Sequence, residues 1–547
     1  MATGVSVRVL GINAVFHDSA AALVVDGRTV AAAEEERFSR RKHGKRPVPF
    51  STWELPEGAI RWCLAEAGLE AADLDAVAYS YDPSLVEPDS GGLDPGWEHL
   101  RTRYAERAPY FLRTLLPDYD PERFRFVRHH VAHAASAGLV APFGDCAVLV
   151  ADGRGEATSS LLGEYRDAKL DILAAQALPH SLGLLYEDLT AHLGFERSSD
   201  EYKVMALASY GTPRHLGRLR DRVHAVDGGF RADGVELTDF ARPRHPGAEF
   251  EDAHADLAAS VQAVLEEVLL ELCHWLHDRT QNPHLALAGG TALNCVANTR
   301  LHAEGPFRSL FVQPASGDSG TALGAALTVA AEAGDPIEPW TTAALGRGFT
   351  DEEIEAALRT ARVPYSRPAD LPEEVAAILA DNGVVAWFTG RAEYGPRALG
   401  YRSLLAHPSR SDNVERLNDI KGREQFRPVA PMVLAERAAQ IFGRGPLPSP
   451  SMLFVHDVDP AWRDRLAAVT HVDGTARIQT VDDSHPTLAA MLRAFDRRTG
   501  VPVVVNTSLN TAGRPMVDSP RDALELFGSA PVDALAIGPF LLRRPQP

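Results

Sequence analysis

Residues 5–33, VSVRVLGINAVFHDSAAALVVDGRTVAAA, decide the first part of the fold. Apolar residues alternate at its start, and an apolar run over residues 20–25 ends in Asp26 and Gly27 before the chain returns over residues 29–33. An Asp-Gly pair between two apolar runs is a strong signal for a hairpin turn. The stretch therefore predicts a strand followed by a two-stranded hairpin.

A second stretch of the same kind is CAVLVADGRGEATSSLLGEY, residues 146–165. An apolar strand meets a glycine-containing turn at residues 153–155, and a second strand follows. A strand that meets such a turn therefore occurs twice. Repetition of a supersecondary unit, with helices after each copy, predicts two related α/β lobes.

The rest of the chain alternates between helical and strand patterns, which makes the fold class α/β. Helices are predicted at residues 56–67, 257–276, 294–300, 322–333, 351–361 and 372–381. Strands are predicted at residues 76–80, 285–288, 309–312 and 384–388, with a final strand pair at 501–505 and 534–542. A loop with Gly334, Pro336 and Pro339 separates two domains. We place the first domain at residues 1–345 and the second at residues 346–547.

Composition excludes several classes of protein. The 547 residues include 55 Lys and Arg against 74 Asp and Glu, a net charge of −19, which argues against nucleic acid as a partner. No apolar run reaches the length of a membrane helix, so we expect no membrane partner. The spacing of the four cysteines fits neither a zinc motif nor a disulfide framework. They predict buried, reduced thiols in a cytoplasmic protein.

The run HHVAH, residues 129–133, predicts a metal site. On a helix, His129 and His133 lie on one face and can bind one ion, whereas His130 points elsewhere. Two imidazoles suit Fe, Zn, Ni or Cu and need carboxylates to complete the ligand set. Asp152, which follows the next strand, is the expected third ligand, and Asp318 the fourth. The alternative is that these histidines are solvated or cap the helix.

Two glycine-rich turns follow strands, in DGRGE at residues 152–156 and AGGT at residues 288–291. Glycine lets the backbone approach a phosphate, whose oxygens the N–H groups then bind. Neither turn matches a Walker loop or a GxGxxG fingerprint, and each alone is more often structural. Their order along the chain favours a phosphate site that includes Gly153, Gly289 and Gly290.

The second domain carries a concentration of basic residues in EYGPRALGYRS (393–403) and KGREQFRP (421–428), with Arg477 and the polar turn NTSLN (506–510) later. Arginine is well suited to binding phosphate through two hydrogen bonds. In an acidic chain, this pattern predicts a pocket for a small phosphorylated anion. The alternative is ion pairing with neighbouring glutamates at the surface.

Taken together and in order, these motifs resemble a known family across essentially the whole chain: the carbamoyltransferase family of nodulation and antibiotic-tailoring O-carbamoyltransferases. The further motifs that carry the resemblance are GIN and HDSA (residues 11–13 and 17–20), EEERFSR (34–40), SLGLLY (181–186), KVMALASYG (203–211) and GGTALNCVAN (289–298). Residues 214–250 match no motif.

The resemblance implies an N-terminal domain of the actin, sugar-kinase and heat-shock ATPase superfamily, similar to the tRNA threonylcarbamoyl transfer proteins, and a YrdC-like C-terminal domain. It also implies the reaction. The C-terminal domain takes carbamoyl phosphate and releases phosphate, and the carbamate reacts with ATP to give carbamoyladenylate and pyrophosphate. A hydroxyl of a small-molecule acceptor, a natural product or a sugar, then takes the carbamoyl group and AMP leaves.

The resemblance assigns roles to particular residues and implies iron(II) at the metal site, with Mg²⁺ left open. His17 and Asp18 are expected to be catalytic, with His17 as general base or orienter. The expected nucleotide-binding residues are Gly153, Lys203, Gly289, Gly290 and Asn294. The residues expected to bind carbamoyl phosphate are Arg397, Lys421, Arg427, Arg477, Asn506 and Asn510.

Two other functions compete with this interpretation. A carbamoyl-transfer protein of tRNA modification or metalloenzyme maturation shares the motifs, but the net charge of −19 argues against tRNA. A nucleotide-binding regulator without catalysis predicts a damaged second domain, yet Arg397, Lys421 and Arg427 remain. The identity of the acceptor and the oligomeric state, including a homodimer, stay open.

Overall fold

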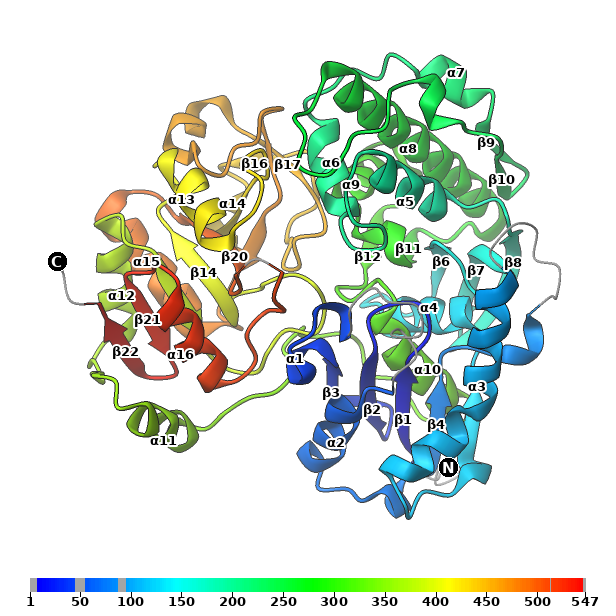
Figure 1. Ribbon diagram of the computed structural model, residues 1–547, viewed down its shortest axis with the longest axis horizontal. Helices are drawn as coiled ribbons and strands as arrows, with labels where there is room; N and C mark the ends of the chain where they lie inside the picture. The colour runs from blue at the N-terminus through cyan, green and yellow to red at the C-terminus, as the bar shows by residue number, and fades with distance from the viewer. Residues whose placement is uncertain (1–6, 45–54, 87–94, 512, 545–547) are drawn as a thin grey trace. The chain divides into compact units, whose positions relative to one another are not determined.

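The chain divides into two compact units, Met1–Thr342 and Ala343–Pro547. The computed structural model describes residues 7–44, 55–86, 95–511 and 513–544 (Figure 1). The division at residue 342 lies close to the predicted boundary at residue 345, within the predicted loop.

The first sheet of unit 1 has the strand order β3-β2-β1-β4-β5. The first three strands are antiparallel, and β4 and β5 run parallel to β1. Asp26 and Gly27 form the turn between β2 and β3, with φ angles of 57° and 75°, so the predicted hairpin is confirmed. Residues 5 and 6 of the predicted first strand lie outside the described residues. The strands are β1 (Arg8–Asn13), β2 (Ala20–Val25), β3 (Arg28–Glu34), β4 (Ala76–Tyr79) and β5 (Phe124–Phe126).

The second sheet of unit 1 repeats this topology. Its order is β8-β7-β6-β11-β12, with β6, β7 and β8 antiparallel and with β11 and β12 parallel to β6. The prediction of two related α/β lobes is therefore confirmed. The strands are β6 (Cys146–Ala151), β7 (Thr158–Arg166), β8 (Lys169–Ala177), β11 (His284–Ala288) and β12 (Ser309–Val312), and a separate small sheet contains β9 (Val223–Val226) and β10 (Gly229–Ala232).

Helix α10 packs against α4 and against β1, so it contacts both lobes. Small side chains permit the close approach: a Cβ at Gly324 of α10 would lie 1.7 Å from the carbonyl oxygen of Ala132 in α4. Larger residues there would force the helices apart. The main helices of unit 1 are α2 (Glu57–Glu66), α3 (Pro95–Leu115), α4 (His129–Gly138), α5 (Leu182–His192), α6 (Glu201–Ala208), α7 (Leu216–Arg220), α8 (Asp252–Thr280), α9 (Cys295–Glu304) and α10 (Ser319–Glu332).

Unit 2 is built on a seven-stranded mixed sheet with the order β19-β15-β20-β14-β13-β21-β22. Helices α12 and α15 pack on each other, and α16 contacts β13 and β21. The strands are β13 (Val385–Phe388), β14 (Arg402–Ala406), β15 (Ala430–Leu434), β19 (Gln479–Val481), β20 (Val503–Ser508), β21 (Ala534–Ile537) and β22 (Phe540–Arg543). The helices are α11 (Asp351–Ala361), α12 (Leu371–Ala380), α13 (Asp412–Lys421), α14 (Ala435–Ala438), α15 (Pro486–Thr499) and α16 (Pro520–Ser529), and β16 (Phe442–Gly443), β17 (His456–Val458) and β18 (Thr475–Ala476) form a small sheet.

The predicted final strand pair is wrong in two respects. Residues 534–542 form a hairpin of two strands, β21 and β22, which turns at Gly538 with a φ of 54°. The strand near residues 501–505, β20, lies between β15 and β14 instead of beside β21. Apolar residues run almost without interruption through this hairpin because both of its strands are buried, and a short apolar run does not reveal its neighbour in the sheet.

No helix in the described parts of the chain is long and apolar enough to cross a membrane. All four cysteines are buried and none is in a disulfide, as the sequence predicts. Burial raises the pKa of Cys146 and of Cys273 to about 12. The thiolate is the reactive form, so at pH 8 both groups are almost entirely in the unreactive thiol form.

We therefore expect native protein at pH 8 to resist iodoacetamide at Cys146 and Cys273, because both the pKa and the surrounding core disfavour attack. The same reagent in urea should modify all four cysteines, which serves as the control. Peptide mass spectrometry after a timed quench measures both results. Rapid modification of either residue in the native protein would contradict the burial described here.

Candidate functional site

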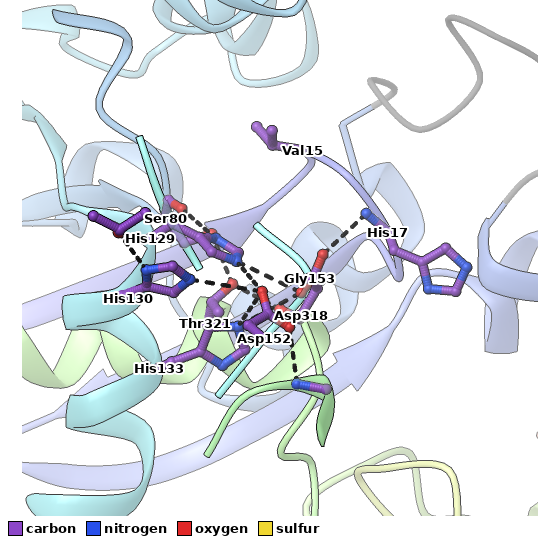
Figure 2. A network of polar contacts seen from close by, with 12 residues as sticks. Val15, His17, Ser80, His129, His130, His133, Asp152, Gly153, Asp318 and Thr321 are labelled. Atoms are coloured by element: carbon purple, nitrogen blue, oxygen red, sulfur yellow. Dashed lines mark hydrogen bonds and ion pairs between the residues drawn. The ribbon is translucent and has the colours of Figure 1, made fainter. Parts of the chain in front are cut away.

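Helix α4 places two imidazoles on one face, one helical turn apart. His129 and His133 are completely buried, and they converge with Asp152 and Asp318 so that one ligand atom from each lies within 4.8 Å of the others (Figure 2). Asp152 follows β6 and Asp318 precedes α10. The structure therefore brings together the four residues that the sequence nominates as metal ligands.

Each carboxylate in this cluster has one oxygen bound by a backbone N–H and one directed at the imidazoles. Oδ1 of Asp152 accepts from the N–H of Gly290 at 2.9 Å, and its Oδ2 lies 3.3 Å from Nε2 of His129. Oδ2 of Asp318 accepts from the N–H of His17 at 3.1 Å, and its Oδ1 lies 3.5 Å from Nε2 of His133. The backbone thus fixes the orientation of both carboxylates.

The orientation of His129 follows from its neighbours. Its Nδ1 lies 3.2 Å from the carbonyl oxygen of Ser80, and because a carbonyl only accepts, Nδ1 donates and Nε2 is the atom left to bind a metal. Glu156 accepts the backbone N–H of His129 at 2.8 Å and that of Asp82 at 2.9 Å. A carboxylate at a helix N-terminus is favourable. The sequence motif DGRGE contains Glu156 but does not reveal this role.

The prediction that His130 points elsewhere is wrong. The side chain is buried, its Nδ1 lies 2.7 Å from Oγ1 of Thr158, and its Nε2 lies 3.8 Å from Oδ2 of Asp152. Helical periodicity alone places His130 about 100° from its neighbour. The bond to Thr158 on β7 turns the ring back toward the cluster.

The chemistry of these residues fits a divalent metal. Both ring nitrogens of His133 are buried without a hydrogen-bond partner among the described residues, which is costly unless a ligand completes them. Ligands about 2.1 Å from one ion lie roughly 3–3.5 Å from each other, close to the spacing seen here. Two histidines and two carboxylates suit iron(II) among other ions.

The carboxylates of the cluster also shift the pKa values of its histidines. Burial lowers the pKa of His129, but the nearby carboxylates of Asp152 and Asp318 outweigh burial and raise that pKa well above its ordinary value; the same two carboxylates raise the pKa of His133. A metal needs neutral imidazole, so its binding must displace these protons.

His17 is tied to this cluster through its backbone, and its side chain points away from the cluster (Figure 2). Its Nδ1 lies 3.0 Å from Oδ2 of Asp18. Burial lowers the pKa of His17, but the carboxylates of Asp18, Asp318 and Glu187 outweigh it and raise that pKa to about 9. The imidazole is therefore placed beside the cluster without being one of its ligands.

The glycine-rich turns lie at the same edge as the cluster. Gly289 has a φ of 92°, and a Cβ there would lie 2.2 Å from the carbonyl oxygen at the end of β6, so only glycine fits. The N–H of Gly290 is directed at Asp152 rather than outward. The carbonyl oxygen of Gly153 accepts from the hydroxyl of Ser181 at 2.7 Å. These contacts show that the two turns also stabilise the local structure, whether or not they contact a phosphate.

The other two residues expected to bind nucleotide are engaged with neighbours. Nζ of Lys203 lies 2.9 Å from a carboxylate oxygen of Asp200. Oδ1 of Asn294 caps α9 by accepting the N–H of Ala297 at 3.1 Å, and its Nδ2 donates to Gln262 at 2.8 Å. Their role in nucleotide binding stays a prediction.

In unit 2, two of the residues expected to bind carbamoyl phosphate contact each other. Lys421, at the end of α13, is buried, and its Nζ donates to the carbonyl oxygen of Ser508 at 2.6 Å, to the hydroxyl of Ser508 at 3.0 Å and to Oδ1 of Asn510. Arg427 pairs with Glu424 at 3.3 Å, which is the ion pairing that the sequence left open as an alternative.

Asn506 links the segments that carry two further arginines. Its buried Nδ2 donates to the carbonyl oxygen of Ala398 at 3.0 Å, next to Arg397, and to Oε1 of Gln479 at 2.8 Å, close after Arg477. Its Oδ1 is buried without a hydrogen-bond partner among the described residues. Asn506 therefore organises the surroundings of the arginines.

The loop that carries Arg397 is organised by Glu393, for which the sequence motif alone predicts no role. The side chain is 1% exposed, and its Oε1 accepts the backbone N–H groups of Leu399, Tyr401 and Arg402 at 2.8, 2.9 and 3.1 Å. A buried carboxylate that accepts several N–H groups fixes the path of a loop.

We expect Glu393→Ala to raise the KM for the predicted ligand, carbamoyl phosphate, by about tenfold or more, because three N–H groups, two of them buried, lose their acceptor and the loop around Arg397 relaxes. Glu393→Gln keeps an acceptor oxygen and should have a smaller effect. Phosphate release at varied carbamoyl phosphate measures both. An alanine variant with unchanged KM would show that the loop keeps its path without this carboxylate.

Family models and relatives match the chain over most of its length. A model described as carbamoyltransferase N-terminus matches residues 8–119 and 116–327, and one described as carbamoyltransferase C-terminus matches residues 376–544. The chain belongs to the carbamoyltransferase family. It is a transferase that moves carbamoyl groups to a small-molecule acceptor.

Individual relatives support this assignment. Nodulation protein NolNO of Sinorhizobium fredii is 38% identical over 97% of this chain and 80% of its own length. Nodulation protein U of the same organism is 31% identical over 95% of this chain and 96% of its own length. A crystal structure of full-length HypF in the phosphate- and nucleotide-bound form covers 61% of this chain and 56% of that chain, with 12% identity and a TM-score of 0.36.

Proposed function

We propose that the protein is an O-carbamoyltransferase that uses ATP and carbamoyl phosphate and acts on a hydroxyl of a natural product or sugar. One observation carries the proposal: in a chain of the carbamoyltransferase family, two histidines and two aspartates form a cluster that could hold a metal, and His17 lies beside it. The cluster and the basic residues of unit 2 offer two chemically distinct sites, which matches a reaction with two stages.

Unit 2 takes carbamoyl phosphate in the first stage. Lys421, Arg397 and Arg477 supply positive charge to the phosphate, and Asn506 and Asn510 orient the chain around it. Water attacks the carbamoyl carbon, the bond between that carbon and the phosphate oxygen breaks, and carbamate and phosphate form. The attack of a carbamate oxygen on the α-phosphorus of ATP then expels pyrophosphate and leaves carbamoyladenylate.

The acceptor hydroxyl reacts in the second stage, in unit 1. His129, His133, Asp152 and Asp318 would hold a divalent ion, iron(II) in our proposal, which supplies Lewis-acid neutralisation of phosphate charge. His17 orients the hydroxyl or, in its neutral form, takes its proton as the oxygen attacks the carbamoyl carbon; because its pKa is raised to about 9, the neutral form is the minority at neutral pH. The bond to the adenylate oxygen breaks, and AMP leaves. Gly153, Gly289 and Gly290 are the turn residues that we propose to bring the backbone close to the nucleotide.

The first test needs no acceptor. Full-length protein is incubated anaerobically with iron(II), ATP and carbamoyl phosphate, and pyrophosphate and AMP are measured. We expect both products only when ATP and carbamoyl phosphate are present together, with hydrolysis of the adenylate yielding AMP. Omission of either substrate is the control. Absence of both products in the complete mixture would refute the proposed route.

The second test identifies the acceptor. Hydroxylated sugars and polyketides are added singly to the complete mixture and analysed by mass spectrometry. A true acceptor should gain about 43 Da, the mass of one carbamoyl group in place of a hydroxyl hydrogen, as nucleophilic attack on the carbamoyl carbon requires. Deoxy analogues that lack the candidate hydroxyl are the matched controls.

A further inference from the structure

One carboxylate is shared between two imidazoles beside the metal cluster. Oδ2 of Asp18 lies 3.0 Å from Nδ1 of His17, and Oδ1 lies 2.8 Å from Nδ1 of His43. The two rings are close, with centroids 4.1 Å apart. An ionised carboxylate only accepts hydrogen bonds, so both Nδ1 atoms donate to Asp18.

His43 is fixed at two further points. Its Nε2 lies 2.8 Å from Oγ of Ser199, and its backbone N–H donates to Oε2 of Glu36 at 2.8 Å. Lys42 pairs with the same carboxylate at 3.7 Å. His43 is therefore bound to Glu36, 7 positions away, and to Asp18 and Ser199, which lie 25 and 156 positions away in the sequence.

The backbone around these residues adopts conformations that side chains disfavour. Asp18 has a φ of 48°, His43 a φ of 59°, and Ser198, next to Ser199, a φ of 57°. Left-handed non-glycine residues cost free energy, persist only where their surroundings enforce them, and gather at functional sites. Asp18, His43 and Ser199 therefore come together in three segments that each contain a residue with a strained, left-handed backbone conformation.

We propose that His43 is a positioning residue for carbamoyl transfer: through Asp18 it holds the imidazole of His17 in the orientation that the reaction needs. The proposal rests on the proposed role of His17. A carboxylate bound by two donors keeps one rotamer, whereas a carboxylate bound by His17 alone can turn with it. Loss of a partner that orients a functional imidazole in this way commonly lowers activity strongly, although the partner itself does not react.

Ser199, His43 and Asp18 are also connected in the order found in catalytic triads, in which a histidine and a carboxylate activate a serine. In that arrangement Ser199 would itself carry the carbamoyl group. The shared carboxylate favours positioning instead, because Asp18 binds His17 as well and His17 adjoins the metal cluster. The variants below distinguish the two roles.

The key variants are His43→Asn and His43→Gln, which separate the two ring nitrogens. The amide of asparagine lies near the position of Nδ1 and can still donate to Asp18, whereas the amide of glutamine lies near Nε2 and can contact only Ser199. We expect kcat for AMP release from ATP and carbamoyl phosphate to fall about 10–100-fold in His43→Gln, as for lost second-sphere partners. His43→Asn should restore most of it, with the KM for ATP unchanged in both.

A spectroscopic measurement tests the same point without turnover. In the full chain labelled with ¹⁵N-histidine and freed of paramagnetic ions, the Nδ1–H of His17 should exchange slowly in the wild type and in His43→Asn. It should exchange rapidly in His43→Gln; His17→Gln assigns the signal. If the wild type releases no AMP, the proposed function fails, and this measurement still decides the role of His43.

Two results would overturn the positioning role. One is a slowly exchanging His17 Nδ1–H in His43→Gln, which would show that Asp18 holds His17 unaided. The other is loss of AMP release in Ser199→Ala together with a carbamoyl adduct on Ser199 in the wild type, which would make Ser199 a nucleophile. Under the positioning role, Ser199→Ala retains most of the activity and no adduct forms.

Discussion

Replacing His133 with alanine is expected to remove the bound metal and to lower AMP formation from ATP and carbamoyl phosphate by at least about 100-fold, because loss of even an outer partner of a metal ligand costs 10–100-fold. Both ring nitrogens of His133 are buried and unpartnered among the described residues, and Nε2 faces both carboxylates. The variant therefore removes a ligand without breaking another hydrogen bond of the ring.

The measurement pairs iron content per chain, after anaerobic reconstitution, with AMP formation. Release of phosphate from carbamoyl phosphate should stay within about twofold of the wild type, since the residues proposed to carry it belong to unit 2 and share no partner with His133 among the described residues. His274→Ala, at an exposed position on α8, is the matched control. A His133→Ala protein that keeps its iron and its AMP formation would show that the ligands lie elsewhere.

Lys421→Met is expected to have the opposite pattern to His133→Ala: it should impair phosphate release and leave the metal site intact. It removes the ammonium that donates to Ser508 and Asn510, and with it the charge proposed to meet the phosphate. Phosphate release from carbamoyl phosphate should fall by about 100-fold, in line with the loss of a charged hydrogen-bond donor from a preorganised site. Iron content should not change.

Two controls separate chemistry from folding in this variant. Lys169→Met, at an exposed position on β8, removes the same charge without touching unit 2. Thermal unfolding shows whether the Lys421→Met chain is folded at the assay temperature. Phosphate release within about threefold of the wild type in a folded Lys421→Met protein would exclude the lysine from the site, because a charged contact is worth more than that.

The net charge of −19 for the whole chain reveals neither the metal cluster of unit 1 nor the basic residues of unit 2. In unit 1 the carboxylates of Asp152 and Asp318 face histidines, and in unit 2 the basic residues gather around β20 and the loop of Glu393. Whole-chain charge bears on the class of partner, such as nucleic acid, whereas the reaction depends on local groups that a sum cannot show.

Several features follow from the sequence because they depend on neighbours along the chain. The turn at Asp26 and Gly27 needs residues that tolerate positive φ, and His129 and His133 share a helix face because four residues make about one turn. The repeated strand and turn likewise predicted the two lobes, since the same local pattern folds in the same way twice.

Other features are decided by tertiary structure, because sheet pairing and burial join residues that no local rule connects. The N–H of His17 meets Asp318 across 301 positions, and His43 meets Ser199 across 156. The bond to Thr158 turns His130 toward the cluster against its helical position. The sequence alone thus determined which residue types are available for a metal and an anion. Only the packing of the two lobes decided how His17, Asp18 and His43 are oriented beside them, since hydrogen-bond direction depends on where distant backbones come to lie.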